Sequence, residues 1–178
     1  MKEETVLTLR SSVKSSFKKS VLVRGTILAV LGVSLWLYGG IFLSIATLST
    51  WGWPILLLGG ALIIIGLLPY RKLSRLENKP HEIIVTDLEE LYFSLQGTPM
   101  FKIALEHIEE MAYLDDDNRY GIGLWVKDPK NKNIIVTHPT LEFNAYLKNC
   151  QKQYLCDVFF PYFSKRSFQE LEELYKSS

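Results

Sequence analysis

The chain has 178 residues, of which 48% are hydrophobic, and its formal net charge is +1. This near-neutral total conceals an uneven distribution, because residues 1–80 carry a net charge of +7 and residues 81–178 a net charge of −6. The acidic second part disfavours nucleic acid as a partner, since a polyanion binds basic surfaces. Once a long apolar segment is set aside, about 100 residues remain for one small soluble domain.

The first 20 residues form a basic tail, expected to be cytosolic, that contains one short segment of strand composition. Residues 5–9, Thr-Val-Leu-Thr-Leu, combine β-branched and aliphatic side chains. Chain ends are often disordered, but a small open sheet has edges that an extra strand can cover. We expect residues 5–9 to pair with a sheet formed by residues 82–136. Residues 11–19 would then be a helical lead whose lysines lie on anionic lipid.

A run of 46 residues without Asp, Glu, Lys, Arg or His follows, from residue 25 to residue 70. As one straight helix it would be about 70 Å long, whereas the hydrocarbon core of a bilayer is about 30 Å thick. Two spans fit if the chain reverses direction, and Gly52 and Pro54 favour a reversal just before a new helix. We therefore predict a transmembrane hairpin over residues 21–70, with helices at about 21–45 and 51–70 and a tip near residues 46–50.

The basic residues predict the orientation of this hairpin. They crowd both of its ends and are absent from its tip: Lys14, Lys18, Lys19 and Arg24 precede it, and Arg71, Lys72 and Arg75 follow in a basic linker of residues 71–80. By the positive-inside rule, both termini are cytoplasmic. Trp51, Trp53, Arg71 and Lys72 are the predicted membrane-interface residues. A cleaved signal peptide is the competing interpretation of the first apolar run, and the second span argues against it.

Glycines recur every seven residues in both predicted spans: Gly25, Gly32 and Gly39 in the first, and Gly52, Gly59 and Gly66 in the second. Seven residues make nearly two helical turns, so each set lies on one face. In an antiparallel hairpin the pairs Gly25 and Gly66, Gly32 and Gly59, and Gly39 and Gly52 then face each other. Facing glycines let helices approach closely, which predicts a tightly packed anchor. No Asp, Glu, His or Lys lies within either span, which disfavours transport.

From residue 81 onward the pattern changes to short strands joined by turns. The predicted strands are residues 82–86, 91–95, 101–105, 111–114, 121–126 and 134–136, with turns at residues 97–99, 115–118 and 128–131. Together they predict an antiparallel meander of six or seven strands.

Helical signals follow the meander. Thr140 is the predicted cap of a helix whose Phe143, Leu147, Cys150 and Tyr154 share a face, and residues 158–162 return to strand. Ser167 and Glu170 have the spacing of a capping box that opens a final helix striped by Phe168, Leu171 and Leu174. The predicted fold class is a transmembrane helical hairpin plus a small α+β domain over residues 81–178, a bent antiparallel sheet or barrel closed by a C-terminal helix.

Two segments carry a resemblance to a known group. Residues 103–110, Ile-Ala-Leu-Glu-His-Ile-Glu-Glu, are similar to the "I-P-W-x-D-I-x-x" element of small bacterial two-span membrane proteins with a cytosolic pleckstrin-homology-like (PH-like) domain, with Ala104 and Leu105 in place of Pro and Trp. Phe160-Pro161, followed by residues 167–171, looks like the last strand and capped helix of that group. The resemblance implies a PH-like fold and a bacterial inner-membrane location, and these proteins mostly have no assigned function.

Residues suited to catalysis or to metal binding are sparse. His81, His107 and His138 lie in segments of different type, and Cys150 and Cys156 match no zinc or redox spacing, which indicates unpaired, partly buried thiols. The acidic turn at residues 115–118 lacks the glycine and the distal glutamate of a calcium loop. No phosphate-binding loop or nucleophile elbow is present. We therefore predict no catalytic activity, metal or cofactor.

The function favoured by these patterns is a non-enzymatic, membrane-anchored PH-like binding or scaffold module. A groove between the sheet and the final helix would present a site for a protein or peptide at the cytoplasmic face. Binding of a lipid headgroup by the loop of Lys127, Lys130 and Lys132 is an alternative, against which the charge of −6 argues. A hairpin that acts in a foreign host membrane is another. The bilayer is an expected partner, nucleic acid is not, and the oligomeric state stays open.

Overall fold

The chain folds as two compact units, one of which interrupts the other in sequence. The computed structural model describes residues 4–116, 119–128 and 134–177. One unit, here called the sheet domain, comprises Met1–Lys14 and Leu76–Ser178, and the other, the helical unit, comprises Ser15–Arg75. The helical unit is therefore an insertion in the sheet domain. The domain predicted over residues 81–178 gains the N-terminal segment and residues 76–80.

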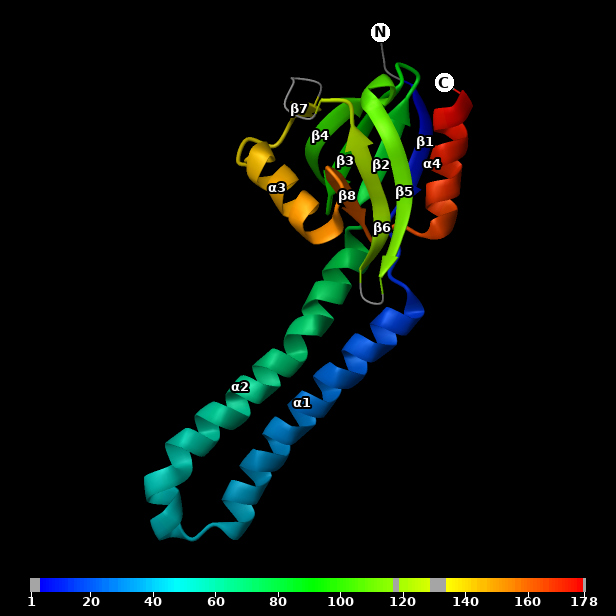
Figure 1. The fold of residues 1–178 in the computed structure, drawn as a ribbon. Helices are drawn as coiled ribbons and strands as arrows, with labels where there is room; N and C mark the ends of the chain where they lie inside the picture. Colours follow the sequence, from blue (N-terminus) through cyan, green and yellow to red (C-terminus); the bar gives the residue numbers. More distant parts are fainter. Residues whose placement is uncertain (1–3, 117–118, 129–133, 178) are drawn as a thin grey trace. The chain divides into compact units, whose positions relative to one another are not determined.

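The helical unit consists of two long apolar helices, α1 (Ser15–Phe42) and α2 (Ile45–Asn78). They run antiparallel to each other (Figure 1). The most apolar 18-residue stretch has a mean hydropathy of 1.9 in α1 and 2.1 in α2, and both helices are long and apolar enough to cross a membrane.

The connection between the two helices is shorter than predicted. It consists of Leu43 and Ser44, and residues 46–50, the predicted tip, are helical. Ser44 is the physical reason, because its Oγ accepts a hydrogen bond from the backbone N–H of Thr47 at 3.3 Å and its carbonyl oxygen accepts one from the N–H of Leu48 at 2.8 Å. A serine that caps the first amides of a helix fixes where the helix begins.

The structure also changes two other expectations for α2. Pro54, expected in the first turn of the second helix, lies inside α2. It removes one backbone donor, and the helix continues on both sides of it. The basic linker predicted over residues 71–80 is helical as far as Asn78, because it contains no glycine or proline before Pro80.

Five antiparallel strands form the larger sheet of the sheet domain. They are β1 (Thr5–Arg10), β2 (Glu82–Thr86), β3 (Glu90–Leu95), β4 (Thr98–Ala104) and β7 (Ile134–Val136), in the order β1-β2-β3-β4-β7. The turn between β3 and β4 is Gln96-Gly97, one residue earlier than predicted. Both residues have positive φ, 54° and 80°, which is the backbone that a two-residue hairpin turn requires.

A second sheet of three antiparallel strands packs on the first. It contains β5 (Ile108–Asp116), β6 (Arg119–Val126) and β8 (Val158–Pro161), in the order β5-β6-β8. The predicted single meander is thus divided, because β7 returns to pair with β4 instead of β6. A short 3-10 turn at Leu105–His107 separates β4 from β5. Side chains from both sheets share one core, including the fully buried Ile83, Leu91, Ile103, Ile122 and Phe160.

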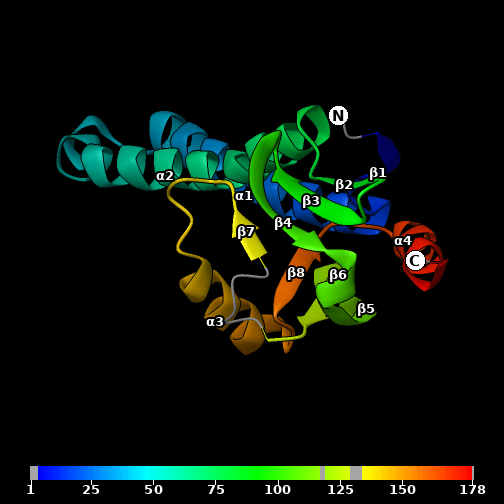
Figure 2. The same cartoon turned by 90° about the horizontal axis from the view of Figure 1, so that it is seen from above.

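Two helices lie at opposite sides of this pair of sheets, α3 (Phe143–Tyr154) beside β7 and β8 and α4 (Lys165–Ser177) beside β1 and β5 (Figure 2). The predicted stripe of α4 is correct, because Leu171 is fully buried in the core and Phe168 and Leu174 pack against it.

Both predicted helix caps are wrong. Ser164 caps α4 in place of Ser167, since its Oγ accepts a hydrogen bond from the N–H of Ser167 at 3.1 Å. In α3 the flanking residue is Glu142, without a side-chain cap, while the hydroxyl of Thr140 bonds to Nδ1 of His138 at 3.1 Å. In α4 a polar residue three positions earlier in the sequence thus takes the capping role.

Candidate functional site

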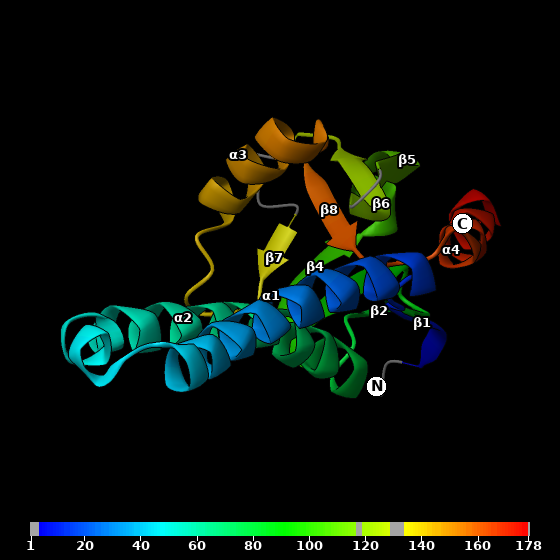
Figure 3. The same cartoon turned by 90° about the horizontal axis from the view of Figure 1, so that it is seen from below.

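Two of the three predicted glycine pairs lie at the contact between α1 and α2, which run side by side (Figure 3). A Cβ atom added to Gly25 would lie 2.5 Å from the carbonyl oxygen of Gly66, and one added to Gly32 would lie 2.5 Å from that of Gly59. Real Cβ atoms do not come so close to a carbonyl oxygen. The backbones can approach in this way only because these positions carry no side chain.

The third pair does not form. A Cβ atom on Gly39 would meet Cγ2 of Ile55 at 3.2 Å, and one on Gly52 would meet only Cγ of Leu48, in its own helix, at 3.8 Å. Trp36 offers the physical reason. Its indole lies against Gly59, and its Nε1–H donates to the carbonyl oxygen of Leu56 at 3.1 Å. A ring of this size between the helices ends the close approach that the glycines permit.

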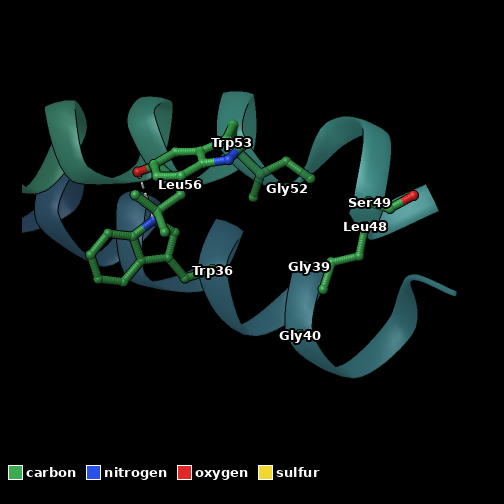
Figure 4. A pocket seen from close by; sticks show the side chains of 9 residues that line it. Trp36, Gly39, Gly40, Leu48, Ser49, Gly52, Trp53 and Leu56 are labelled. Carbon is green, nitrogen blue, oxygen red and sulfur yellow. Dashed lines mark hydrogen bonds between the residues drawn. The ribbon is translucent and has the colours of Figure 1, made fainter. Parts of the chain in front are cut away.

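Beyond Trp36 the two helices leave an open hollow of about 510 Å³ between them, here called the interhelical wedge (Figure 4). Nine residues line it: Trp36, Gly39, Gly40, Leu48, Ser49, Gly52, Trp53, Ile55 and Leu56. The lining is predominantly apolar, and the hydroxyl of Ser49 donates to the carbonyl oxygen of Ala46 at 2.8 Å.

We call the contact formed by Gly25, Gly32, Gly59 and Gly66 the glycine seam. Replacing one of these glycines should loosen the packing of α1 against α2. Gly32→Leu or Gly59→Leu forces the backbones apart, and overpacking of this kind costs about 1–3 kcal/mol. The midpoint of thermal unfolding of the purified protein in detergent should therefore fall. Gly40→Leu is the matched control, because a Cβ atom at Gly40 meets nothing within 4 Å. An equal fall in the unfolding midpoint for all three variants would contradict the assignment of the glycine seam.

The predicted interface residues all lie on α2. Trp51 is 59% exposed and Trp53 is 71% exposed, both in the first third of the helix. Arg71 and Lys72 are exposed near its other end. The four side chains thus divide into an aromatic pair and a basic pair, separated along one helix, as the two boundaries of an apolar layer require.

Of the three lysines proposed for headgroup binding, one lies in the described part of the chain. Lys127 donates from Nζ to the carbonyl oxygen of Glu106 at 2.9 Å. Lys130 and Lys132 lie outside the described residues.

An apolar groove in the sheet domain was not located by sequence reasoning. It lies against α3, whereas the expected groove adjoined the final helix. It has a volume of about 170 Å³ and is lined by Phe93, Leu95, Met100, Phe101, Tyr146, Asn149, Cys150, Gln153, Tyr154, Phe159 and Pro161. None of these side chains is charged. We call it the α3 groove.

Gly121 and Gly123 of β6 are the sequence signal that could have indicated how α3 packs. They alternate with the buried Ile122 and Leu124, so they lie on the opposite face of the strand. A Cβ atom on Gly121 would lie 3.0 Å from the Phe159 ring, and one on Gly123 would lie 3.4 Å from Sγ of Cys156. Two glycines with this spacing leave room for the small cluster of Cys150, Cys156 and Phe159.

The N-terminal segment is a structural part of the sheet domain. Strand β1 pairs antiparallel with β2, with Leu9 opposite Ile83, so residues 5–9 pair with the sheet as expected. Ser11 continues the contact, since its N–H donates to the carbonyl oxygen of His81 and its Oγ accepts from the N–H of His81, both at 2.8 Å. We call residues 11–14 the N-terminal strap.

Tyr120 holds the rest of the strap. Its hydroxyl donates to the carbonyl oxygen of Ser12 at 2.8 Å and accepts a hydrogen bond from the N–H of Lys14 at 2.6 Å. Lys14 also bonds through Nζ to Asp115 at 2.7 Å, and its ammonium group lies 4.5 Å from the centre of the Tyr120 ring. The segment between β1 and the helical unit is therefore anchored by side chains from distant parts of the chain.

Burial determines the pKa values of the histidine and the cysteines in the core of this domain. His81 is 4% exposed, and burial lowers its pKa to about 4. Burial also raises the pKa of Cys150 and raises that of Cys156 to about 12. These thiols are free and buried, so the reactive thiolate form is disfavoured. Within residues 4–116, 119–128 and 134–177, no three His, Cys, Asp or Glu side chains are grouped to hold a metal ion.

No family model, curated protein or solved structure matches this chain.

Proposed function

We propose that this protein is a non-enzymatic, membrane-anchored binding module. The helical unit spans the bacterial inner membrane as a hairpin with both termini in the cytoplasm, and the sheet domain offers a protein- or peptide-binding groove at the cytoplasmic face. The observation that carries the proposal is the distribution of exposed apolar side chains. Most large hydrophobic residues that are exposed lie on α1 and α2, and a surface of this kind is stable in hydrocarbon.

The proposed fold of the sheet domain is PH-like. In its support, two antiparallel sheets enclose one core, and a C-terminal helix, α4, contributes Leu171 to that core. A small antiparallel sheet domain with a C-terminal helix is what a PH-like fold would share with this domain. Its first strand, β1, precedes the hairpin in sequence and pairs with β2, as expected for residues 5–9.

Cysteine labelling tests the anchor. All basic residues that flank the apolar segment lie at its two ends, so the positive-inside rule places the connection between α1 and α2 on the side of the membrane away from the cytoplasm. In intact cells, a cysteine at Ser49 should react with a membrane-impermeant maleimide, and a cysteine at Ser74 should react only after permeabilisation. Labelling of Ser74 without Ser49 would show the inverted topology, and extraction of the protein by alkaline carbonate would refute the anchor.

The α3 groove is the proposed binding site because it is apolar, uncharged and formed by both sheets and a helix. A volume of about 170 Å³ is below the 300–1,000 Å³ typical of sites for whole small molecules. It suits one large apolar side chain of a partner, whereas an anionic headgroup would need basic groups that the lining lacks.

Site-specific photo-crosslinking tests the groove. A benzoylphenylalanine at Leu95, which lines the groove, should give a discrete adduct in cells. The same probe at the exposed Leu88, outside the groove, should not. Gln153→Trp fills the groove and should remove the adduct while the protein level stays unchanged. An adduct that persists in this variant, or that also forms at Leu88, would exclude the groove as the binding site.

A further inference from the structure

The interhelical wedge has the size of a ligand site and lies between helices that otherwise pack closely. Its volume of about 510 Å³ falls within the range typical of sites for small molecules. Trp36 and Leu56 close one end, where the indole N–H bonds to the Leu56 carbonyl (Figure 4). A Cβ atom at Gly40 would meet nothing within 4 Å, so the hollow is open space in front of this residue.

The chemistry of the lining selects an apolar occupant. The Trp36 N–H and the Ser49 hydroxyl both donate to backbone carbonyls of α2, and the sequence contains no charged residue from position 25 to position 70. A polar ligand would lose its hydration and gain few hydrogen-bond partners in return, which is costly. A hydrocarbon chain has no polar group to dehydrate, and in the wedge it makes van der Waals contacts with the lining side chains.

We propose that the interhelical wedge binds one hydrocarbon chain of a membrane lipid, an inference that rests on the proposed position of the helical unit in a bilayer. Trp53 lines the wedge and is 71% exposed, and an indole at a membrane boundary places its N–H near the headgroups. A second copy of the chain is the competing occupant. Gly25, Gly32, Gly59 and Gly66, which allow close helix approach, already face each other within one chain, and this favours the lipid.

Native mass spectrometry of the full chain in detergent, titrated with palmitoyl-oleoyl phosphatidylglycerol, tests the proposal. The wild type should retain one lipid. Gly40→Leu and Gly52→Leu fill the wedge from its two sides, and each should weaken retention about tenfold, the equivalent of about ten lost contacts between carbon atoms. Ala61→Leu, at an exposed position of α2 outside the wedge, should retain the lipid like the wild type.

The outcomes separate this inference from the function on which it rests. If cysteine labelling shows the membrane hairpin but the wedge-filling variants retain the lipid as well as Ala61→Leu does, the lipid site is refuted and the anchor stands. A dimer mass that disappears in Gly40→Leu would assign the wedge to a second copy and also overturn the lipid site. Release of the protein by alkaline carbonate would overturn both. Unchanged thermal unfolding of Gly40→Leu shows that any loss of lipid is not a loss of fold.

Discussion

Leu9→Ala is expected to lower the free energy of unfolding of the sheet domain by about 2–5 kcal/mol, the usual cost of truncating a buried leucine. Leu9 is 3% exposed and belongs to the main core cluster, although it precedes the helical unit in sequence. Small domains have a total stability of about 5–15 kcal/mol, so this one change removes a large share. The measurement is the urea dependence of amide hydrogen exchange in residues 82–95 of the full chain in detergent.

Thr8→Ala is the matched control for this prediction. Thr8 is the neighbour of Leu9 on the same strand, but its side chain is exposed, and surface substitutions usually change stability by less than about 0.5 kcal/mol. If β1 were an accessory tail, both variants would behave alike. Equal, small effects of Leu9→Ala and Thr8→Ala would therefore contradict the assignment of β1 to the core.

Acidification is expected to destabilise the sheet domain through His81. The neutral ring accepts a hydrogen bond at Nδ1 from the backbone N–H of Gln96, at 3.2 Å, and stacks on Tyr162, with ring centres 6.0 Å apart. Burial lowers its pKa to about 4, from 6.5. Between pH 6.5 and pH 4, His81 is protonated in the unfolded chain but neutral in the folded domain. The free energy of unfolding therefore falls as the pH falls through this range. The loss amounts to about 3 kcal/mol and is complete below about pH 4.

Two measurements check the role of His81 on the full chain in detergent. The NMR resonance of the His81 Cε1–H should titrate with a midpoint near pH 4. The variant His81→Gln keeps a hydrogen-bond acceptor at this position but does not titrate. Its free energy of unfolding should lack the fall between pH 6.5 and pH 4 that is due to His81 in the wild type. A midpoint of about 6 or higher in the wild type would mean that the ring is hydrated and would refute the prediction.

The sequence by itself determined the local elements of this protein. The uncharged run from residue 25 to residue 70 predicts two long apolar helices, and the structure has them as α1 and α2. The alternating residues after position 81 predict a small antiparallel sheet domain, and the stripe of Phe168, Leu171 and Leu174 predicts the C-terminal helix. These features follow from periodicity, because apolar residues with a period near 2 or 3.6 can bury one face in only one type of element.

Only the tertiary structure decided how these elements combine. The division into two sheets depends on β7 pairing with β4, the strap depends on the hydroxyl of Tyr120, and the wedge depends on Trp36 ending the glycine contact. None of these is set by neighbours in sequence: Lys14 and Tyr120 are 106 residues apart. Contacts of this kind form when side chains from distant segments compete for the same space and the same hydrogen-bond partners. Packing of the whole core selects among them, so the periodicity of a local segment does not predict which contacts form.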